Sequence, residues 1–174
     1  MAARLNVMKH TADVPGRDTV DQDRWGIAPS VTFGVGGPTR ATVSYYGLRA
    51  DDVPDLGHPF DTGLPGAAGR PVNVDRDNFY GVAGRDKRSN DADVGTIDLE
   101  HDVSGDLKIR NVTRWSQTTN KYIMSRPSIH AASGMVNRDW RASNKRNEAL
   151  TNQTDVSASI AWASSTTISR WAWN

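Results

Sequence analysis

Cysteine is missing from the 174-residue chain, which excludes a disulfide framework, a thiolate zinc site and a cysteine nucleophile. No run of apolar residues approaches the roughly 18 that a membrane-spanning helix needs. The first ten residues have no apolar core of signal-peptide length, so we expect no signal peptide within the chain as written. A charge excess is also missing, since Lys and Arg number 21 against 20 Asp and Glu. This balance argues against binding to nucleic acid or anionic lipid mainly by charge.

The length and composition fit two classes of protein. A chain of 174 residues is about one domain, and a hydrophobic share of 37% suits either a polar soluble domain or a β-barrel with alternating apolar and polar residues. The 15 glycines and 8 prolines are spread through many short segments. This distribution argues against a helix bundle.

Alternation of apolar and polar residues indicates β-strands. Between positions 25 and 35 the apolar side chains occupy odd positions, and the same alternation resumes over 41–45 after the breaker 36–38. These two runs predict an antiparallel hairpin. Further strands are expected at about 5–7, 97–100, 107–115 and 150–160.

Two long polar stretches, 49–92 and 117–147, separate the predicted strands and alternate with tight turns at 36–38 and 104–106. In an antiparallel meander, all the tight turns then lie at one end. We therefore predict an all-β, antiparallel up-and-down meander with long external loops, as in an outer-membrane barrel. A soluble sheet with one wet face would show the same alternation. The side chains expected to face a water-filled lumen are Thr42, Ser44, Asp98, Glu100, Lys108, Arg110 and Arg114.

A series of short motifs runs along residues 4–160. They are Arg4-Leu5-Asn6-Val7-Met8, Gly16-Arg17-Asp18, Gly26-Ile27-Ala28-Pro29-Ser30-Val31-Thr32-Phe33-Gly34, Pro38-Thr39-Arg40, Ser44-Tyr45-Tyr46, Asp52-Val53-Pro54-Asp55, Pro59-Phe60-Asp61, Asp75-Arg76-Asp77-Asn78-Phe79-Tyr80-Gly81, Glu100-His101-Asp102, Arg110-Asn111-Val112-Thr113-Arg114 and Asn152-Gln153-Thr154-Asp155. In this order the motifs resemble TonB-dependent siderophore receptors of Gram-negative outer membranes, in the region where the barrel begins after the N-terminal plug.

The resemblance implies a twenty-two-stranded transmembrane barrel closed around a plug, which imports ferric siderophores with energy passed through TonB. Twenty-two strands need about 200 residues before any loop is counted. We therefore expect residues 1–160 to be a partial barrel domain of about six strands, from a receptor whose plug contacts the TonB complex. Such a fragment is not expected to function alone. Residues 161–174 depart from the family pattern, and we hypothesise that the chain comes from a frameshifted or truncated receptor gene.

One cluster offers a rationale for ligand binding. Arg85 and Arg88 lie close in sequence to Phe79 and Tyr80, and ferric siderophore complexes are often anionic and aromatic. Guanidinium groups and ring faces suit such a ligand. The alternative is a solvated loop whose aspartates compensate the arginines. Four further aromatic residues are candidates for the girdle at a membrane interface, namely Tyr45, Tyr46, Trp115 and Trp140.

No catalytic, metal or cofactor site is predicted. The four histidines have no metal-ligand spacing, and no nucleophile, base and orienting group can be assembled. Asp75-Arg76-Asp77-Asn78 lacks the glycine and the closing glutamate of a calcium loop. We expect a non-enzyme in the outer membrane with three partners: ferric siderophore, the TonB complex and membrane lipid. Nucleic acid is not an expected partner.

Two alternatives remain open. A complete small outer-membrane barrel of eight strands could just be supplied by 174 residues. A soluble β-sandwich could bind carbohydrate through Tyr80, Trp115 and Trp140. A barrel fragment would require detergent, because it would expose unpaired edge strands and an apolar surface, whereas the sandwich would be a soluble monomer.

Overall fold

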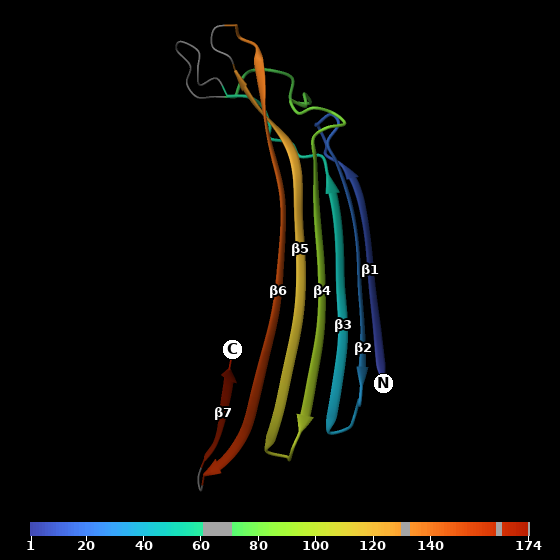
Figure 1. The fold of residues 1–174 in the computed structure, drawn as a ribbon, viewed down its shortest axis with the longest axis vertical. Helices are drawn as coiled ribbons and strands as arrows, with labels where there is room; N and C mark the ends of the chain where they lie inside the picture. Colours follow the sequence, from blue (N-terminus) through green and yellow to red (C-terminus); the bar gives the residue numbers. More distant parts are fainter. Residues whose placement is uncertain (61–70, 130–132, 163–164, 174) are drawn as a thin grey trace.

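The computed structural model describes residues 1–60, 71–129, 133–162 and 165–173, with side chains described as far as Ser159. Seven strands form one sheet in sequence order, and each strand is antiparallel to the next (Figure 1). The strands are β1 (Ala2–Asp13), β2 (Asp21–Phe33), β3 (Thr39–Asp52), β4 (Lys87–Asp102), β5 (Leu107–Ile129), β6 (Val136–Trp162) and β7 (Ser165–Trp173). This arrangement confirms the predicted all-β meander.

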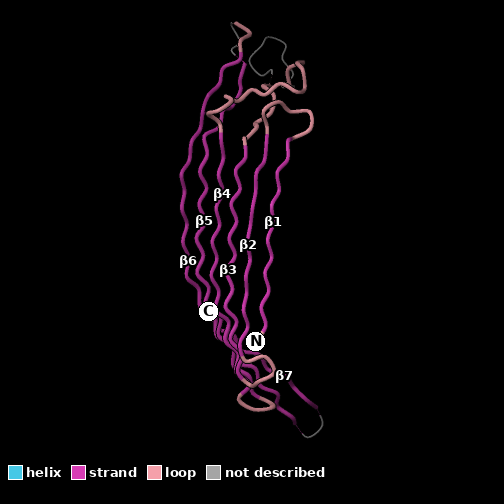
Figure 2. The backbone as a smooth tube through the Cα atoms, turned by 90° about the vertical axis from the view of Figure 1, so that its right-hand side faces the viewer, coloured by secondary structure: helices cyan, strands magenta, loops and turns pink. Residues whose placement is uncertain are grey.

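The connections alternate in length along the chain. Residues 34–38 join β2 to β3 and residues 103–106 join β4 to β5, and both turns lie at the end of the sheet that holds the N-terminus (Figures 1 and 2). The connection 14–20 and the described parts of the connections 53–86 and 130–135 lie at the opposite end, here called the long-loop end. The sheet therefore has the two unlike ends that the sequence predicted.

The two long loops are shorter than predicted. Strand β3 continues to Asp52 and β4 starts at Lys87, so the loop expected at 49–92 spans only 53–86. Most of the stretch expected as the loop 117–147 is strand instead, because β5 continues to Ile129 and pairs with β6 from Val136. These parts of β5 and β6 carry polar residues on both faces, so their sequence shows no period of two, although the backbone ladder is intact.

The expected atypical tail, 161–174, coincides with the end of β6 and with β7, which pairs with β6. Its side chains, and Ile160 before it, lie outside the side chains that the structure describes. The frameshift hypothesis stays a prediction.

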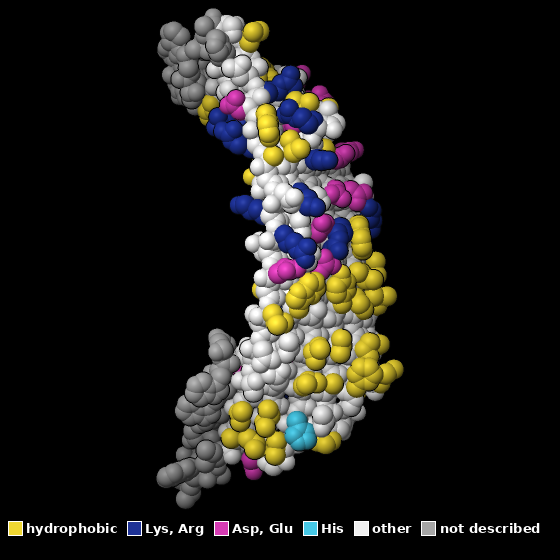
Figure 3. Space-filling view, viewed as in Figure 1, with side chains coloured by type: hydrophobic (Ala, Val, Ile, Leu, Met, Phe, Trp, Pro, Cys, Tyr) yellow, Lys and Arg dark blue, Asp and Glu magenta, His cyan; other side chains and the backbone are white. Residues whose placement is uncertain are grey.

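One face of the sheet carries large apolar side chains that no other part of the described chain covers. Hydrophobic side chains occupy this face toward the tight turns, and charged ones lie beyond them (Figure 3). Leu5 is 63% exposed, Val7 70% and Leu150 73%. We call this surface the apolar face; its exposed members are Leu5, Val7, Trp25, Phe33, Val43, Tyr45, Ile97, Leu99, Ile109, Trp115 and Leu150.

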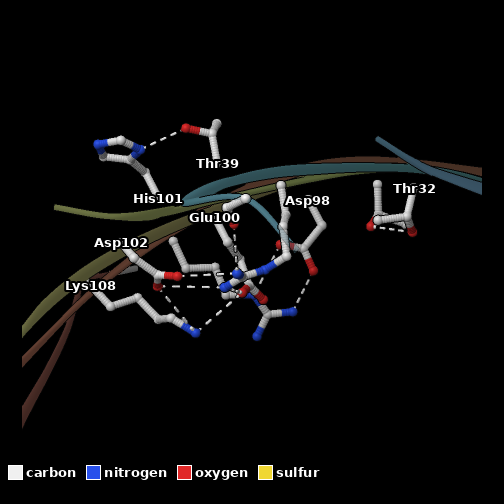
Figure 4. Close-up of polar contacts among 11 residues, drawn as sticks. Thr32, Thr39, Asp98, Glu100, His101, Asp102 and Lys108 are labelled. Carbon is white, nitrogen blue, oxygen red and sulfur yellow. Dashed lines mark hydrogen bonds and ion pairs between the residues drawn. The ribbon is translucent and has the colours of Figure 1, made fainter. Parts of the chain in front are cut away.

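The opposite face carries a network of ion pairs near the tight turns (Figure 4). Arg40 Nη2 donates to Glu100 Oε2 at 2.8 Å, and Arg40 Nη1 donates to Asp102 Oδ2 at 3.1 Å. Arg110 Nε donates to Asp98 Oδ1 at 2.9 Å, and Lys108 lies 3.3 Å from Glu100. The strand register places Thr42, Ser44 and Arg114 on this polar face as well, as the sequence predicted.

Two of the four candidate girdle residues fit one row. Tyr45 and Trp115 both pair with Gly95, so they lie in one row across the apolar face. Tyr46 points to the polar face, because neighbouring residues of a strand alternate. Trp140 lies ten residues from Leu150 along β6, about 33 Å farther toward the long-loop end. Tyr46 and Trp140 are therefore not in this row, and the girdle assignment of the four residues stays a prediction.

The sheet has almost no hydrophobic interior. Among the described residues, the buried hydrophobic ones are Val20 and Ala50. A β-sandwich packs two sheets about a shared core, whereas the described strands form a single sheet. The described residues contain no helix that is long and apolar enough to cross a membrane.

Candidate ligand-binding site

The connection 53–86 lies at the long-loop end and is anchored to its neighbours. The Val53 amide donates to the Asp21 carbonyl at 3.1 Å, and the Asp18 amide donates to the Asp77 carbonyl at 2.9 Å. From β6, Arg138 Nη1 donates to the Gly81 carbonyl at 3.1 Å. The described parts of the loop are thus tied to strands on both sides of it.

Arg85, the first predicted ligand-binding cation, contacts a buried carboxylate. Its Nε donates to Asp86 Oδ1 at 3.0 Å, and its Nη2 donates to the Ser125 hydroxyl of β5. The Asp86 side chain is fully buried, whereas the Arg85 side chain remains 41% exposed. Arg85 is therefore held in place on one side and open to solvent on the other.

Asp86 is ionised in this setting. Burial raises the pKa of its carboxyl, but hydrogen bonds from Ser125, the Val82 amide and Arg85 outweigh that effect and leave the pKa below its usual range. Because Asp86 keeps its negative charge, it compensates the positive charge of Arg85. This part of the cluster matches the alternative in which loop aspartates neutralise the arginines.

Arg88, the second predicted cation, lies at the start of β4 on the polar face. Its Nη2 donates to Asp52 Oδ2 at 2.7 Å, and Arg24 Nη2 donates to Asp52 Oδ1 at 3.2 Å. Asp52 is buried, while Arg24 and Arg88 keep 36% and 39% of their side-chain surface exposed. Two guanidinium groups share one carboxylate, so the group has a net positive charge.

Phe79 and Tyr80, the predicted aromatic residues, are both half-buried in the loop. The Phe79 ring lies over Gly81, where an added Cβ would be 2.1 Å from Phe79 Cζ, so only glycine fits beneath the ring. The Tyr80 ring packs edge-on against His58, with ring centroids 5.7 Å apart. Both rings therefore have fixed neighbours.

The four predicted residues are all near the long-loop end, but the structure does not join them in one contact cluster. Arg85 contacts Asp86 and Ser125, whereas Arg88 contacts Asp52. Sequence reasoning missed Arg24, which shares Asp52 with Arg88, and Tyr122, which pairs with Arg88 across β4 and β5. The alternation around Trp25 could have placed Arg24 on the polar face. Sequence reasoning missed Tyr122 because this part of β5 was expected to be a loop.

The arginine group has the chemistry of an anion-binding surface. Guanidinium groups carry permanent charge and several fixed N–H donors, and they stack on aromatic rings. Arg24 and Arg88 retain exposed surface, and Arg88 pairs with Tyr122, so charge and an aromatic side chain lie next to each other at Arg88. Within the described ranges no cluster of three or more potential metal ligands is found.

Known proteins resemble the chain in both sequence and fold, although no family model matches it. A Bordetella pertussis protein named as a probable TonB-dependent receptor, BfrD, is 38% identical over 161 residues, which cover 89% of this chain. The catecholate siderophore receptor Fiu of Escherichia coli K12 is 34% identical over 91% of this chain. The crystal structure of the ferric-catecholate import receptor Fiu in its closed form superposes on 92% of this chain with a TM-score of 0.80 and 31% identity. The chain is homologous to part of the TonB-dependent siderophore receptors.

A second receptor of the family supports the same conclusion. The crystal structure of the siderophore receptor PiuA from Acinetobacter baumannii superposes on 92% of the chain with a TM-score of 0.78 and 31% identity. The chain spans only 21% of BfrD, 23% of Fiu and 24% of the PiuA structure. The sheet therefore matches part of a TonB-dependent receptor barrel, and neither a complete eight-stranded barrel nor a β-sandwich is favoured.

Proposed function

We propose that the chain forms part of the barrel wall of an outer-membrane receptor that takes up ferric siderophores, from the N-terminal part of that barrel. TonB would supply the energy through the receptor's plug. The relatives' names provide the class of ligand, and the contrast between the two faces of the sheet carries the proposal. A wall strand must present apolar side chains to lipid and polar ones to the barrel lumen.

The apolar face has the dimensions of a membrane-crossing surface. In β2, apolar residues recur at alternate positions from Trp25 to Phe33, a span of nine residues, and a tilted barrel strand crosses the membrane in about 9–11 residues. Tyr45 and Trp115 lie in one row across this face, and barrels place aromatic side chains of this kind near the membrane interfaces. Strands β5 and β6 continue well beyond this row, so the long-loop end would project outside the cell.

The ligand would be an anionic ferric catecholate that reaches the barrel from the long-loop end. Fiu is named a catecholate siderophore receptor. Here the chemistry that suits such a ligand comes from Phe79, Tyr80, Arg85 and Arg88, together with Arg24 and Tyr122. We infer that the net charge of the Arg24, Asp52 and Arg88 group attracts the anion, and that the exposed parts of both guanidiniums donate hydrogen bonds to it. No catalytic step is part of the proposed function.

A segment exchange tests this function. Residues 4–160 would replace the aligned segment of Fiu, and the chimera would be expressed in E. coli cells that lack their own catecholate receptors. We expect the chimera to insert into the outer membrane as a folded barrel, which is seen as a shift in gel mobility on heating. We also expect TonB-dependent growth with a ferric catecholate as the iron source. A chimera that fails to insert would overturn the proposal, as would one that inserts at the parental level without supporting growth.

Single substitutions in this chimera test the ligand site. Arg24→Ala and Arg88→Ala should each weaken ferric-catecholate binding about tenfold, the effect of losing one charge-assisted hydrogen bond. Arg146→Ala is the matched control, because Arg146 is an exposed arginine that pairs with Glu148 away from Asp52. Equal losses from all three variants would show that the net charge alone attracts the ligand.

A further inference from the structure

One arginine joins two separate connections at the long-loop end. Arg17 lies between β1 and β2, and its Nε donates to Asp55 Oδ2 at 2.5 Å in the connection between β3 and β4. Arg17 Nη1 lies 2.7 Å from both the Arg76 carbonyl oxygen and His58 Nε2. A single side chain thus holds two stretches of the long connection that are far apart in sequence, Asp55 to His58 and Arg76.

The contact is mostly closed to solvent. The side chain of Arg17 is 15% exposed and that of Asp55 is 16% exposed. Ion pairs in such surroundings are screened less than surface pairs, and removal of one partner leaves the other charge without compensation. The backbone reinforces the contact, since the Asp18 amide donates to the Asp77 carbonyl at 2.9 Å. Arg17 therefore stands at the centre of an interlocked pair of loops, here called the Arg17 clamp.

His58 connects the Arg17 clamp to Tyr80, one of the predicted ligand-binding residues. A guanidinium group has only donors, so His58 Nε2 is the acceptor of the hydrogen bond from Arg17. The Tyr80 ring meets the His58 ring at an interplanar angle of 85°, a favourable edge-to-face arrangement. The orientation of Tyr80 thus depends on His58, and that of His58 on Arg17.

We propose that Arg17 is a positioning residue for siderophore binding, acting through His58 to hold the Tyr80 ring in its binding orientation. The proposal rests on the proposed function and on Tyr80 as a ligand contact. A Tyr80 ring that is already held in place loses less conformational entropy when the ligand binds, so binding is stronger. Lysine could not replace Arg17, because one ammonium group cannot reach the carboxylate, the carbonyl and the imidazole in the planar geometry of a guanidinium.

Hydrogen exchange tests the clamp without any ligand. In the full 174-residue chain in detergent micelles, Arg17→Ala and Arg17→Lys should each raise the exchange of the Asp18 and Gly57 amides at least about tenfold. The Gly57 amide is a suitable reporter because it donates to Asp55 Oδ1 at 2.8 Å. Arg76→Ala is the matched control, because it removes a charge from the same loop and keeps the carbonyl that Arg17 contacts. Unchanged exchange in the Arg17 variants, or amides already unprotected in the unsubstituted chain, would overturn the clamp.

A double-mutant cycle in the Fiu chimera tests the positioning role. If Arg17 acts through Tyr80, the double variant Arg17→Ala/Tyr80→Ala binds ferric catecholate no more weakly than Tyr80→Ala alone. His58→Gln should give the same loss as Tyr80→Ala, while the Asp18 amide keeps its protection. Additive losses would overturn the positioning role. If the unsubstituted chimera binds no ferric catecholate, the proposed function and the positioning role fail together, whereas the exchange result still decides whether the clamp exists.

Discussion

Replacement of Asp86 offers a sharp test of how the long-loop end is held to the sheet. Asp86 directly precedes β4, and its Oδ2 accepts the Ser125 amide at 2.8 Å and the Val82 amide at 3.2 Å. Strand β4 begins at Lys87, which pairs with Ile123. The carboxylate therefore takes the place of the next backbone carbonyl for β5, and Asp86→Ala should release the loop from β5 at this point.

The magnitude follows from the groups left without partners. The buried Ser125 amide and the part-buried Val82 amide lose an ionised acceptor, and a hydrogen bond to a charged group is worth about 1.5–3 kcal/mol. Arg85 adds little, because its side chain is 41% exposed and water can solvate it. We expect Asp86→Ala to cost about 3 kcal/mol locally. Asp86→Asn can keep one oxygen facing both amides, so it should cost only about 1 kcal/mol.

The assay is hydrogen exchange of the Ser125 amide in the detergent-bound chain. A cost of about 3 kcal/mol corresponds to roughly hundredfold faster exchange in Asp86→Ala. Amides in the centre of β5, such as that of Thr113, serve as the internal reference and should not change. Equal exchange rates for Asp86→Ala and the unsubstituted chain would refute the reasoning, as would a loss of protection along the whole of β5.

Lowering the pH should release the Ser125 amide in the same way as Asp86→Ala does. The folded state lowers the pKa of Asp86, so its stabilising contribution is complete above the unfolded value of about 3.9 and disappears as pH falls through the lower folded value. Protection of the Ser125 amide should therefore stay constant from neutral pH to about pH 4 and decline below it. Asp86→Asn should remove this step. Protection that instead rises on acidification would contradict the assigned direction.

Three further predictions concern the sheet itself. Asn152→Val should cost about 1–3 kcal/mol of sheet stability, because it leaves a side-chain N–H of Asn111 without its acceptor. The double variant Asn111→Val/Asn152→Val should cost less than the two single variants added together, and hydrogen exchange of the amides between β5 and β6 measures both effects. Ile97→Arg should destabilise the membrane-inserted chain by about 2–4 kcal/mol in urea titrations, and no change would argue against lipid contact. Gly34→Ala should open the hairpin between β2 and β3 by about 1–3 kcal/mol or more, since Gly34 has φ +69 and an added Cβ would lie 2.0 Å from the Thr39 oxygen. Unaltered exchange of the Gly37 amide would count against that strain.

The sequence allowed the membrane-depth part of the fold to be predicted, because there one face is apolar and the other polar. Apolar and polar residues alternate from Trp25 to Phe33 and around Ile97 and Leu99 because of that contrast. Strand continuity beyond Trp115 could not be read in the same way. From Gln117 to Ile129 both faces carry mainly polar side chains, so only the backbone pairing with β6 defines the strand.

The candidate site was predictable in its residue types and not in its contacts. Arg85 and Arg88 stood out because they lie near two aromatic residues in sequence. The carboxylates that hold them come from different places, since Asp86 is adjacent to Arg85 and Asp52 is 36 residues from Arg88. Arg17 lies in the motif Gly16-Arg17-Asp18, but its contacts could not be predicted, because Asp55, His58 and Arg76 come together with it only when two connections meet in the folded chain.

A single-cysteine scan along β4 tests the central claim, that one face of this sheet meets lipid and the other meets water. The absence of native cysteine makes each label unique. Residues 95–101 would be replaced one at a time in chain inserted into lipid vesicles, and each would carry an environment-sensitive fluorophore. We predict a period of two, with labels at Ile97 and Leu99 quenched by nitroxide lipids and labels at Asp98 and Glu100 quenched by a water-soluble reagent. Equal quenching of neighbouring positions by both reagents would contradict the account.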